Sequence, residues 1–220
     1  MSETLSTIAV KTGKKLVFID LETFNLCLNV FNNLPWQAAV LKIENNRLTE
    51  SKDFHVKWKT DLKISEEAKK ITGFSQARFN KLCKPEEEVF EEIYKDLNEC
   101  DNIIGHNILG FDMYLIRGWC KKHNKPHEHL WDKCIDTLAL GRAEVAKDVN
   151  ERIRYYAKEH DLMEFQYKML NYRKRGLKAK LSDLAKRYNI DFDTSKLHDA
   201  LYDLKINWMV WKEMNKRLTK

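Results

Sequence analysis

Acidic residues with unusual spacing follow the first apolar run of the sequence. Asp20 and Glu22 come directly after Leu16–Ile19, with one residue between them. Side chains two residues apart on a strand point to the same face, so these carboxylates project together. Two close carboxylates repel each other, and one of them is then normally protonated. A divalent cation removes this conflict, and ligands that are all oxygen favour Mg²⁺ or Mn²⁺ over zinc. Taken alone, the pair is more often a solvated strand end.

Two later stretches carry further acids next to a histidine. In "IIGHNILGFDMYLI", Asp112 follows His106 and Asn107 and opens a predicted helix, where the helix dipole also favours an acid for structural reasons. In "KLHDALYDLKIN", His198 and Asp203 lie on either side of a predicted helix start. The structural alternative for His198 is a capping or surface histidine, and the neighbouring acid, residue 199, is expected to cap the helix.

The elements that would position these side chains follow from the hydrophobic pattern. Strands are predicted at 16–22, at two runs within 37–58 around a turn at 44–46, at 102–107 and at 132–140. Helices are predicted from 65 with Ser65 as the cap, at 85–98, at 111–123, within 142–175, at 180–190 and at 199–216. Strands followed by alternating strands and helices predict an α/β domain with a mixed sheet.

Composition is consistent with one globular domain over residues 1–220, preceded by a loose tail at 1–15. Apolar residues make up 43% of the chain and charged residues 33%, and the net charge of +6 is compatible with an anionic partner. Five cysteines without a CxxC pair are expected to be reduced thiols, which predicts an intracellular, cytoplasmic protein. No signal peptide or membrane-spanning run is found, so no membrane association is expected.

The order and spacing of the four acids and the histidine form a specific pattern. Asp20, Glu22, Asp112 and Asp203, with His198 five residues before the last acid, resemble the DEDD superfamily of 3′→5′ exonucleases. The H-x4-D form of the last motif resembles the DEDDh branch, which includes bacterial proofreading subunits, ribonuclease T and oligoribonuclease. The stretches "ISEEAKKITGFSQ", "CIDTLAL" and "LSDLAKRYNIDFDTSKLHDALYD" agree with it, and the resemblance covers residues 16 to about 212.

This resemblance implies a fold, a reaction and a cofactor. The implied fold is ribonuclease H-like, with a five-stranded mixed sheet flanked by helices on both faces. The implied reaction is hydrolysis of DNA or RNA from the 3′ end to nucleoside 5′-monophosphates, with two Mg²⁺ or Mn²⁺ ions. Asp20 would bridge the ions, Glu22 and Asp203 would hold the ion on the nucleophile side, and Asp112 would act on the other. His198 would be the general base.

The resemblance also implies contacts to the terminal nucleotide. Leu26 would wedge against the terminal base, while the backbone near Thr23 and the side chain of Asn107, next to His106, would touch the nucleotide. The family's usual Thr-Thr-Gly-Leu is replaced here by residues 23–26, "TFNL". Phe24 is therefore expected to alter the nucleotide pocket.

Two further departures concern the backbone. Asn25 takes the place of the family's glycine and is expected to adopt a left-handed conformation, which asparagine tolerates well. The second motif has one residue more than usual between His106 and Asp112, which a small bulge can absorb.

A basic segment precedes the last motif. Residues 171–180 include Arg173 and Arg175 among five basic side chains without an acid, and arginines and tyrosines occur at 152–156. Basic and aromatic residues together favour binding of a single strand. Residues 142–178 are accordingly interpreted as an inserted basic helical arm. The alternative is a solvated helix whose aromatic residues pack on the domain.

Several roles and partners remain open from the sequence. The expected partner is a nucleic-acid 3′ end, preferably single-stranded, and the protein is a free-standing exonuclease or a proofreading or repair subunit that binds a polymerase. A homodimer is equally compatible. A non-catalytic binding module is disfavoured because all four acids and the histidine are present. The zinc-type ligands Cys120, His123, His127, His129 and Cys134 match no known spacing, and a histidine-rich connection is preferred over a zinc site.

Overall fold

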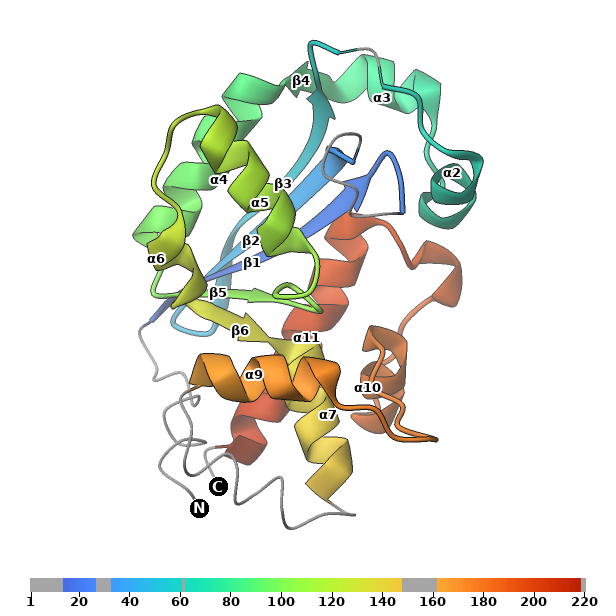
Figure 1. Cartoon of the computed structure of the whole chain (residues 1–220). Coiled ribbons are helices and arrows are strands. Elements are labelled where there is room, and N and C mark those ends of the chain that lie inside the picture. The colour runs from blue at the N-terminus through green and yellow to red at the C-terminus, as the bar shows by residue number, and fades with distance from the viewer. Residues whose placement is uncertain (1–13, 27–32, 61, 148–161, 219–220) are drawn as a thin grey trace.

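The computed structural model describes residues 14–26, 33–60, 62–147 and 162–218. Its centre is a mixed sheet with the strand order β4-β3-β2-β1-β5-β6 (Figure 1). The strands are β1 (Lys15–Thr23), β2 (Pro35–Glu44), β3 (Arg47–Lys57), β4 (Cys83–Pro85), β5 (Asn102–Gly105) and β6 (Cys134–Asp136).

Strands β1 to β3 form an antiparallel meander, and the other pairs of neighbouring strands are parallel. Asn45 and Asn46 connect β2 to β3 with φ values of 51° and 60°. Such left-handed backbone suits asparagine and matches the twist of a hairpin, which explains the turn predicted at 44–46. The parallel arrangement of β1, β5 and β6 brings their carboxyl ends to one edge of the sheet, where ligands of open α/β sheets bind.

The predicted α/β class with a mixed sheet is confirmed, and the number of strands differs from the prediction. All five predicted strands are present, and β4 adds a sixth next to β3. β4 has only three residues and ends in a proline, so it carries no alternating pattern that the sequence could reveal. The strand predicted at 132–140 is also shorter than expected, because Thr137 already begins a helix.

Helices surround this sheet. They are α2 (Glu66–Thr72), α3 (Gln76–Leu82), α4 (Glu86–Glu99), α5 (Asp112–Lys122), α6 (Glu128–Trp131), α7 (Thr137–Lys147), α9 (Leu162–Asn171), α10 (Leu181–Arg187) and α11 (Ala200–Leu218), with a short 3₁₀ turn at Thr194–Lys196. Ser65 caps α2 as predicted, because its hydroxyl accepts the N–H of Ala68 at 3.1 Å.

Two layers of helices bury the sheet. Helices α4 and α5 cover one face, and α11 crosses the other face behind β1 and β2 (Figure 1). The buried core includes Phe18 and Ile19 of β1, Phe90 of α4 and Trp211 of α11. The start of α11 therefore lies against the strand that carries Asp20.

The described part of the segment predicted as an arm belongs to the body of the domain. Phe165 and Gln166 of α9 are buried. The Gln166 side chain accepts the backbone N–H of Asp136 at 2.6 Å and donates to the carbonyl of Cys134 at 3.1 Å. One amide thus pairs with the free edge of β6, and α9 packs on the domain. The interpretation of residues 142–178 as an inserted basic arm stays a prediction. The basic and aromatic residues at 152–156 lie outside the described residues.

Among the described residues, no helix has both the length and the apolar character needed to cross a membrane.

Candidate active site

The end of β1 presents two acids to the same side. Asp20 and Glu22 are half-buried, whereas Leu21 and Thr23 between and after them are buried. The parallel neighbour β5 pairs with β1 only as far as Phe18, so the two strands separate just before the acids. This separation opens the sheet where the carboxylates lie.

Asp112 closes the gap between the two strands. It is the first residue of α5 and is buried, and its Oδ1 accepts the N–H of Leu21 at 3.0 Å. Asp112 therefore begins a helix, as its structural role requires, and it also faces the strand that carries Asp20. Its position is compatible both with a helix-start role and with a role as a metal ligand.

The loop before α11 delivers the last acid and the histidine. His198 has a φ of 68°, a left-handed conformation that is uncommon outside glycine and asparagine. This turn lets its N–H donate to Oδ2 of Asp203 at 3.1 Å. Ligand atoms of Glu22, His198 and Asp203 all lie within 4.8 Å of one another. The first and last motifs therefore meet, although about 180 residues separate them.

The four acids have pKa values well above the ordinary range of a carboxyl group. Burial, with repulsion from Asp203 and residue 199, raises the pKa of Asp20 to about 8. Burial and the charge of Asp20 raise the pKa of Glu22 to about 10. For Asp112 the same two causes raise the pKa well above its usual value. Burial raises the pKa of Asp203 to about 6, against the hydrogen bond from the His198 N–H. The cluster concentrates negative charge that a cation would stabilise.

Two observations show that the donor set fits a divalent cation. Oδ1 of Asp203 is buried and has no hydrogen-bond partner among the described residues. The described lysines and arginines also form no ion pair with any of the four acids. Carboxylate oxygens with free lone pairs at a strand end are hard ligands of the type that Mg²⁺ or Mn²⁺ binds.

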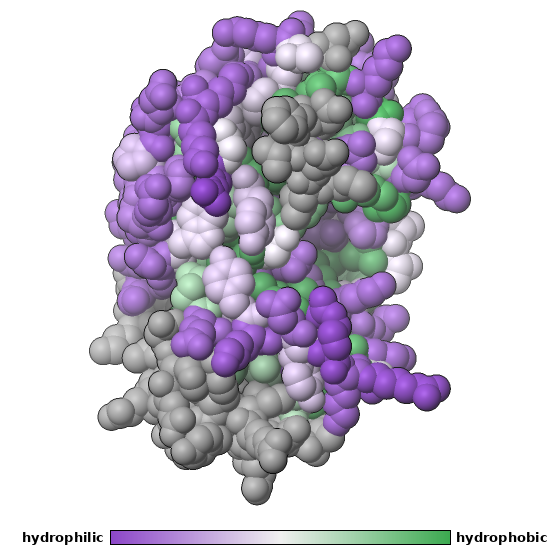
Figure 2. Space-filling model, viewed as in Figure 1, coloured by the Kyte–Doolittle hydropathy of each residue, from purple (hydrophilic) through white to green (hydrophobic). Residues whose placement is uncertain are grey.

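Three of these acids, Asp20, Glu22 and Asp203, line a cavity of about 1030 Å³ together with His198, and we call this cavity the catalytic groove. The opposite wall is the segment 172–180 together with the start of α10, and it is basic: Arg173, Lys174, Lys178 and Lys180 line it. In Figure 2, hydrophilic side chains gather at the lower right, over the connection between α9 and α10. A strand of phosphates can lie along this wall while its end reaches the acids.

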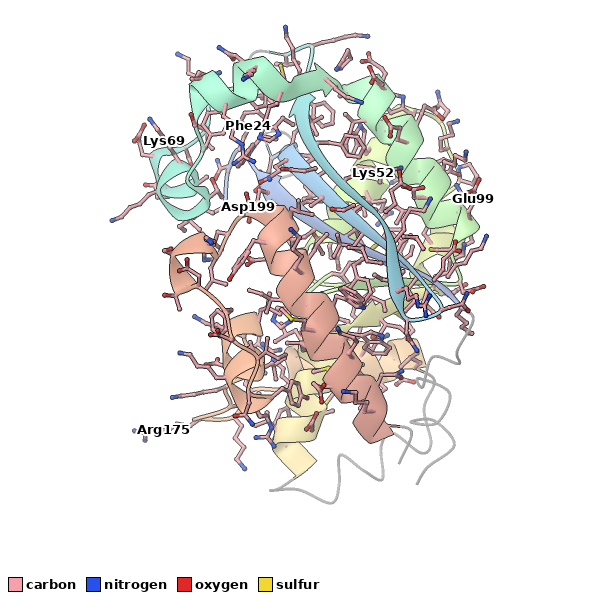
Figure 3. The ribbon with its side chains drawn as sticks, turned by 180° about the vertical axis from the view of Figure 1, so that it is seen from behind. Phe24, Lys52, Lys69, Glu99, Arg175 and Asp199 are labelled. Carbon is pink, nitrogen blue, oxygen red and sulfur yellow. The ribbon has the colours of Figure 1, made fainter. Side chains whose placement is uncertain are left out.

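Three of the seven residues predicted to bind the substrate line the catalytic groove. His106, Asn107 and Arg173 line it. Arg175 does not, and in Figure 3 its side chain points away from the body of the domain. Leu26 is 46% exposed and lies outside the lining. Its role as a wedge stays a prediction.

Two expectations for residues 23–26 were wrong. Phe24 is buried and packs edge-on against Phe79, with ring centroids 6.2 Å apart, and against Phe74 at 6.5 Å, so its side chain does not line the catalytic groove. Asn25 does not have a positive φ. The Thr23 hydroxyl donates to the Asn25 carbonyl at 2.6 Å, and this short bond shapes the turn without left-handed backbone.

The extra residue of the second motif is absorbed by a loop that Asp136 organises. Asp136, at the end of β6, accepts the N–H groups of Asn107 and Leu109, each at 3.1 Å, as well as those of Leu138 and Ala139 at the start of α7. Asn107 has a φ of 66°. Burial raises the pKa of Asp136 to about 6, against these four hydrogen bonds.

From the sequence, Asp136 was assigned only to a predicted strand, and its role in organising this loop was not identified. An acid at the carboxyl end of a parallel strand is the signal that could have identified it. Next to it, Thr137 contacts Nδ1 of His106 at 3.1 Å and donates to Asn207 of α11 at 2.7 Å. Burial lowers the pKa of His106 to about 3, so this imidazole is neutral.

The cysteine and histidine residues that have zinc-type chemistry do not converge. His123 contacts Glu86 at 2.8 Å, and His129 contacts Asn98 at 2.6 Å. Cys120 and Cys134 are buried, and burial raises the pKa of the Cys120 thiol to about 12. Within the described ranges, the one cluster with metal-ligand spacing is that of Glu22, His198 and Asp203. The preference for a histidine-rich connection over a zinc site agrees with this arrangement.

Fold and site together define an α/β domain with an acidic groove at the carboxyl ends of parallel strands. The family model described as exonuclease (RNase_T) matches residues 17–210, so the chain belongs to this exonuclease family. The match includes all four acids and His198. No curated protein matches the chain.

Solved structures with the same fold include exonuclease I from two bacteria. E. coli exonuclease I in complex with a dT13 oligonucleotide aligns with a TM-score of 0.70 and 19% identity over 93% of this chain and 41% of that one. Its zinc-bound complex with single-stranded DNA aligns with a TM-score of 0.70 and 19% identity, over 94% of this chain and 42% of that one. Exonuclease I from Methylocaldum szegediense aligns with a TM-score of 0.66 and 19% identity, over 94% of this chain and 42% of that one. The chain thus spans about two fifths of the length of these relatives.

Proposed function

We propose that this protein is a divalent-metal-dependent 3′→5′ exonuclease that releases nucleoside 5′-monophosphates from DNA or RNA. The observation that carries the proposal is that Asp20, Glu22, Asp203 and His198 line one groove, with Asp112 hydrogen-bonded to the backbone of Leu21 between the first two acids. The described lysines and arginines form no ion pair with these acids. Membership in the exonuclease family supports it. Two Mg²⁺ or Mn²⁺ ions, when bound, would lower the pKa of the attacking water and stabilise the leaving 3′ oxygen.

The positions of the acids support the ligand roles that the family resemblance implies. Asp20 is repelled by Asp203 and also acts on Glu22 and Asp112, which suits the carboxylate shared by both ions. Glu22 and Asp203, which lie together with His198, would hold the ion on the nucleophile side. Asp112 would act on the other ion from the start of α5.

His198 has the properties of a general base. Burial of its ring and the positive charge of Lys180 lower its pKa, so the imidazole is neutral near pH 7 and can accept a proton. Its backbone bond to Asp203 fixes the residue beside the acids. Lys180 also lines the basic wall of the catalytic groove, where it would contact the phosphate backbone.

The substrate would enter along the basic wall as a single strand. Arg173 and its basic neighbours would contact phosphates, and Asn107 with His106 would meet the terminal nucleotide. The complex of E. coli exonuclease I with single-stranded DNA supports this proposal. A repair or proofreading role, with a polymerase or a second copy as partner, would be tested by co-purification.

A time course on end-labelled oligonucleotides tests the proposed function. Single-stranded DNA, duplex DNA and RNA are incubated with Mg²⁺ or with Mn²⁺, and the products are separated by length. We expect a ladder that shortens from the 3′ end, mononucleotide 5′-phosphates, and no cleavage in EDTA. Cleavage that continues in EDTA, or internal cuts, would overturn the proposal. Asp20→Asn serves as the inactive control.

A further inference from the structure

A second basic cavity lies on the far side of the loop that carries His198. It has a volume of about 510 Å³ and is formed by the end of α2, Arg78 of α3, residues 195–197 with Asp199, and the first turns of α11. We call it the second groove. Its size is within the range of sites that hold a small ligand or a few groups of a larger one.

One stretch of chain separates the two grooves. Leu197 lines both of them, His198 lines only the catalytic groove, and Asp199 lines only the second groove. The first turns of α11 also contribute to both grooves, because Asp203 lines the catalytic groove and Tyr202 lines the second groove. Figure 3 shows Asp199 at the start of α11, on the side of α2. The second groove therefore adjoins the active site and is not a remote surface feature.

The lining of the second groove is positively charged. It contains the cations Lys70, Arg78, Lys196 and Lys205, and Asp199 is its one acid among the described residues. Arg78 lies 3.8 Å from Asp199 and 3.4 Å from Asp53, so the charge of Arg78 is compensated within the chain. Lys70 and Lys205 are exposed and have no ion-pair partner among the described residues. These two charges are available to an anion.

The loop that forms this wall is fixed by its own hydrogen bonds. The N–H of Asp193 donates to the hydroxyl of Tyr202 at 2.7 Å, and the Asp193 carboxylate accepts the N–H and the hydroxyl of Ser195. Asp199 accepts the N–H of Tyr202 at 3.0 Å and so caps α11, as the sequence predicted. The second groove is thus held in shape by side chains that do not themselves face the acids.

We propose that the second groove binds phosphates of the strand opposite to the one being degraded. This inference rests on the proposed exonuclease function. The catalytic groove already has a basic wall along which the degraded strand can lie, and that strand ends at the acids. Phosphates bound on the other side of the His198 loop would lie beyond this 3′ end, so they would belong to an opposite strand that extends past a recessed 3′ end. The substrate class is accordingly a 3′ end at or near a duplex.

Binding measurements in EDTA test the inference without any need for cleavage. The full chain, a Lys70→Glu/Lys205→Glu variant and a Lys95→Glu/Lys121→Glu control are compared by fluorescence anisotropy. Lys95 and Lys121 are exposed lysines on α4 and α5, away from both grooves. The probes are a hairpin duplex with a recessed 3′ end and a 5′ overhang, and a single strand with the same 3′ sequence, each as DNA and as RNA.

We expect the groove variant to weaken Kd for the duplex by about tenfold at low salt, with a flatter salt dependence, because contacts to phosphates are lost. Its Kd for the single strand should stay within about twofold, and the control variant should match the wild type. Equal losses on both probes, no loss on either, or failure of the wild-type chain to bind the duplex would overturn the inference.

A competition arm separates the second strand from another source of phosphate. Deoxyadenosine 5′-monophosphate is titrated against the bound duplex and, with Mn²⁺, against cleavage of the single strand. If the Lys70→Glu/Lys205→Glu variant loses inhibition by the mononucleotide and keeps its duplex affinity, the second groove holds released product and the inference is wrong. Absence of cleavage by the wild type would instead refute the proposed function, and the duplex Kd would still decide the inference.

Discussion

Two groups of buried acids in this molecule differ in how their charge is compensated. Asp96 of α4 is buried, and its two oxygens lie 3.0 Å from Nζ of Lys42 on β2 and 2.7 Å from Nζ of Lys52 on β3. Glu86 similarly meets Trp119, Lys122 and His123. The acids of the catalytic groove have no such cation among the described residues.

This difference distinguishes structural acids from functional ones. Burial of a charge is unfavourable unless a partner compensates it, and the chain supplies the partners for Asp96 and Glu86. For Asp20 and Glu22, burial raises the pKa values, and the neighbouring acids raise them further. An acid whose charge the chain leaves uncompensated is placed to bind a cation from solution.

The largest contrast is expected between Asp20→Asn and Asp96→Asn in catalysis. Asp20→Asn should lower the rate of single-strand cleavage by at least about 10³-fold, because the shared ligand of the cations is lost. Asp96→Asn should leave the rate within about twofold, since Asp96 lies away from the groove. Initial rates with Mn²⁺ measure both. Comparable activity of the two variants would show that the charge contrast does not mark the active site.

His198→Ala should have the next largest effect. Loss of the proton acceptor lowers the rate by roughly 10²–10⁴-fold, while the acids and their affinity for cations remain. Rates between pH 5 and 9, together with Mn²⁺ binding by calorimetry, separate the two properties. His129→Ala, at an exposed histidine bonded to Asn98, is the matched control. A rate within about threefold of the wild type would remove His198 from the role of general base.

Stability should respond in the opposite sense to activity. Asp96→Asn leaves Lys42 and Lys52 without their buried partner and should lower the free energy of unfolding by about 2–3 kcal/mol. Asp20→Asn should stabilise the metal-free protein at pH 8, because it removes an uncompensated charge. Urea unfolding at pH 8 in EDTA measures both. Destabilisation of similar size in the two variants would mean that Asp20 is compensated within the chain.

Charges outside the two groups should have smaller effects. Arg173 lines the catalytic groove and Arg175 does not, so Arg173→Glu should weaken the Kd for a single strand by roughly tenfold at low salt and Arg175→Glu by less than about threefold. Anisotropy at two salt concentrations gives both values. Equal losses would mean that the strand follows the outer surface of the turn and not the wall of the groove.

The residues that were predicted correctly are those whose placement follows from local rules. Alternation along β1 places Asp20 and Glu22 on one side, and a capping pattern identifies Ser65. The meeting of Glu22 with His198 and Asp203 was predicted from the family resemblance alone, since no local rule connects residues so far apart in sequence.

The misses depend on partners that are distant in the chain. Phe24 is core because Phe74 and Phe79 surround it, and its own neighbours in the sequence give no sign of this. Asp136 organises the groove through backbone N–H groups of Asn107 and Leu109, which carry no residue-specific signal. The strand β4 is defined by its pairing with β3 and not by its own pattern.

Thermal unfolding against pH, with and without Mn²⁺, tests the central claim most directly. Folding raises the pKa of Asp20 from 3.8 to about 8 and that of Asp203 to about 6. At these two acids the folded protein therefore binds more protons than the unfolded chain above about pH 4. The stability of the metal-free wild type, measured relative to an Asp20→Asn/Asp203→Asn variant that keeps the same histidines, should fall as the pH rises from 5 to 8.

Mn²⁺ should restore the Tm of the wild type at pH 8, because the ion compensates the ionised acids. It should have little effect at pH 5 or on an Asp20→Asn/Asp203→Asn variant. A metal-free Tm of the wild type that is constant or rises over this range relative to that of the variant, together with a Tm at pH 8 that Mn²⁺ does not change, would contradict the account.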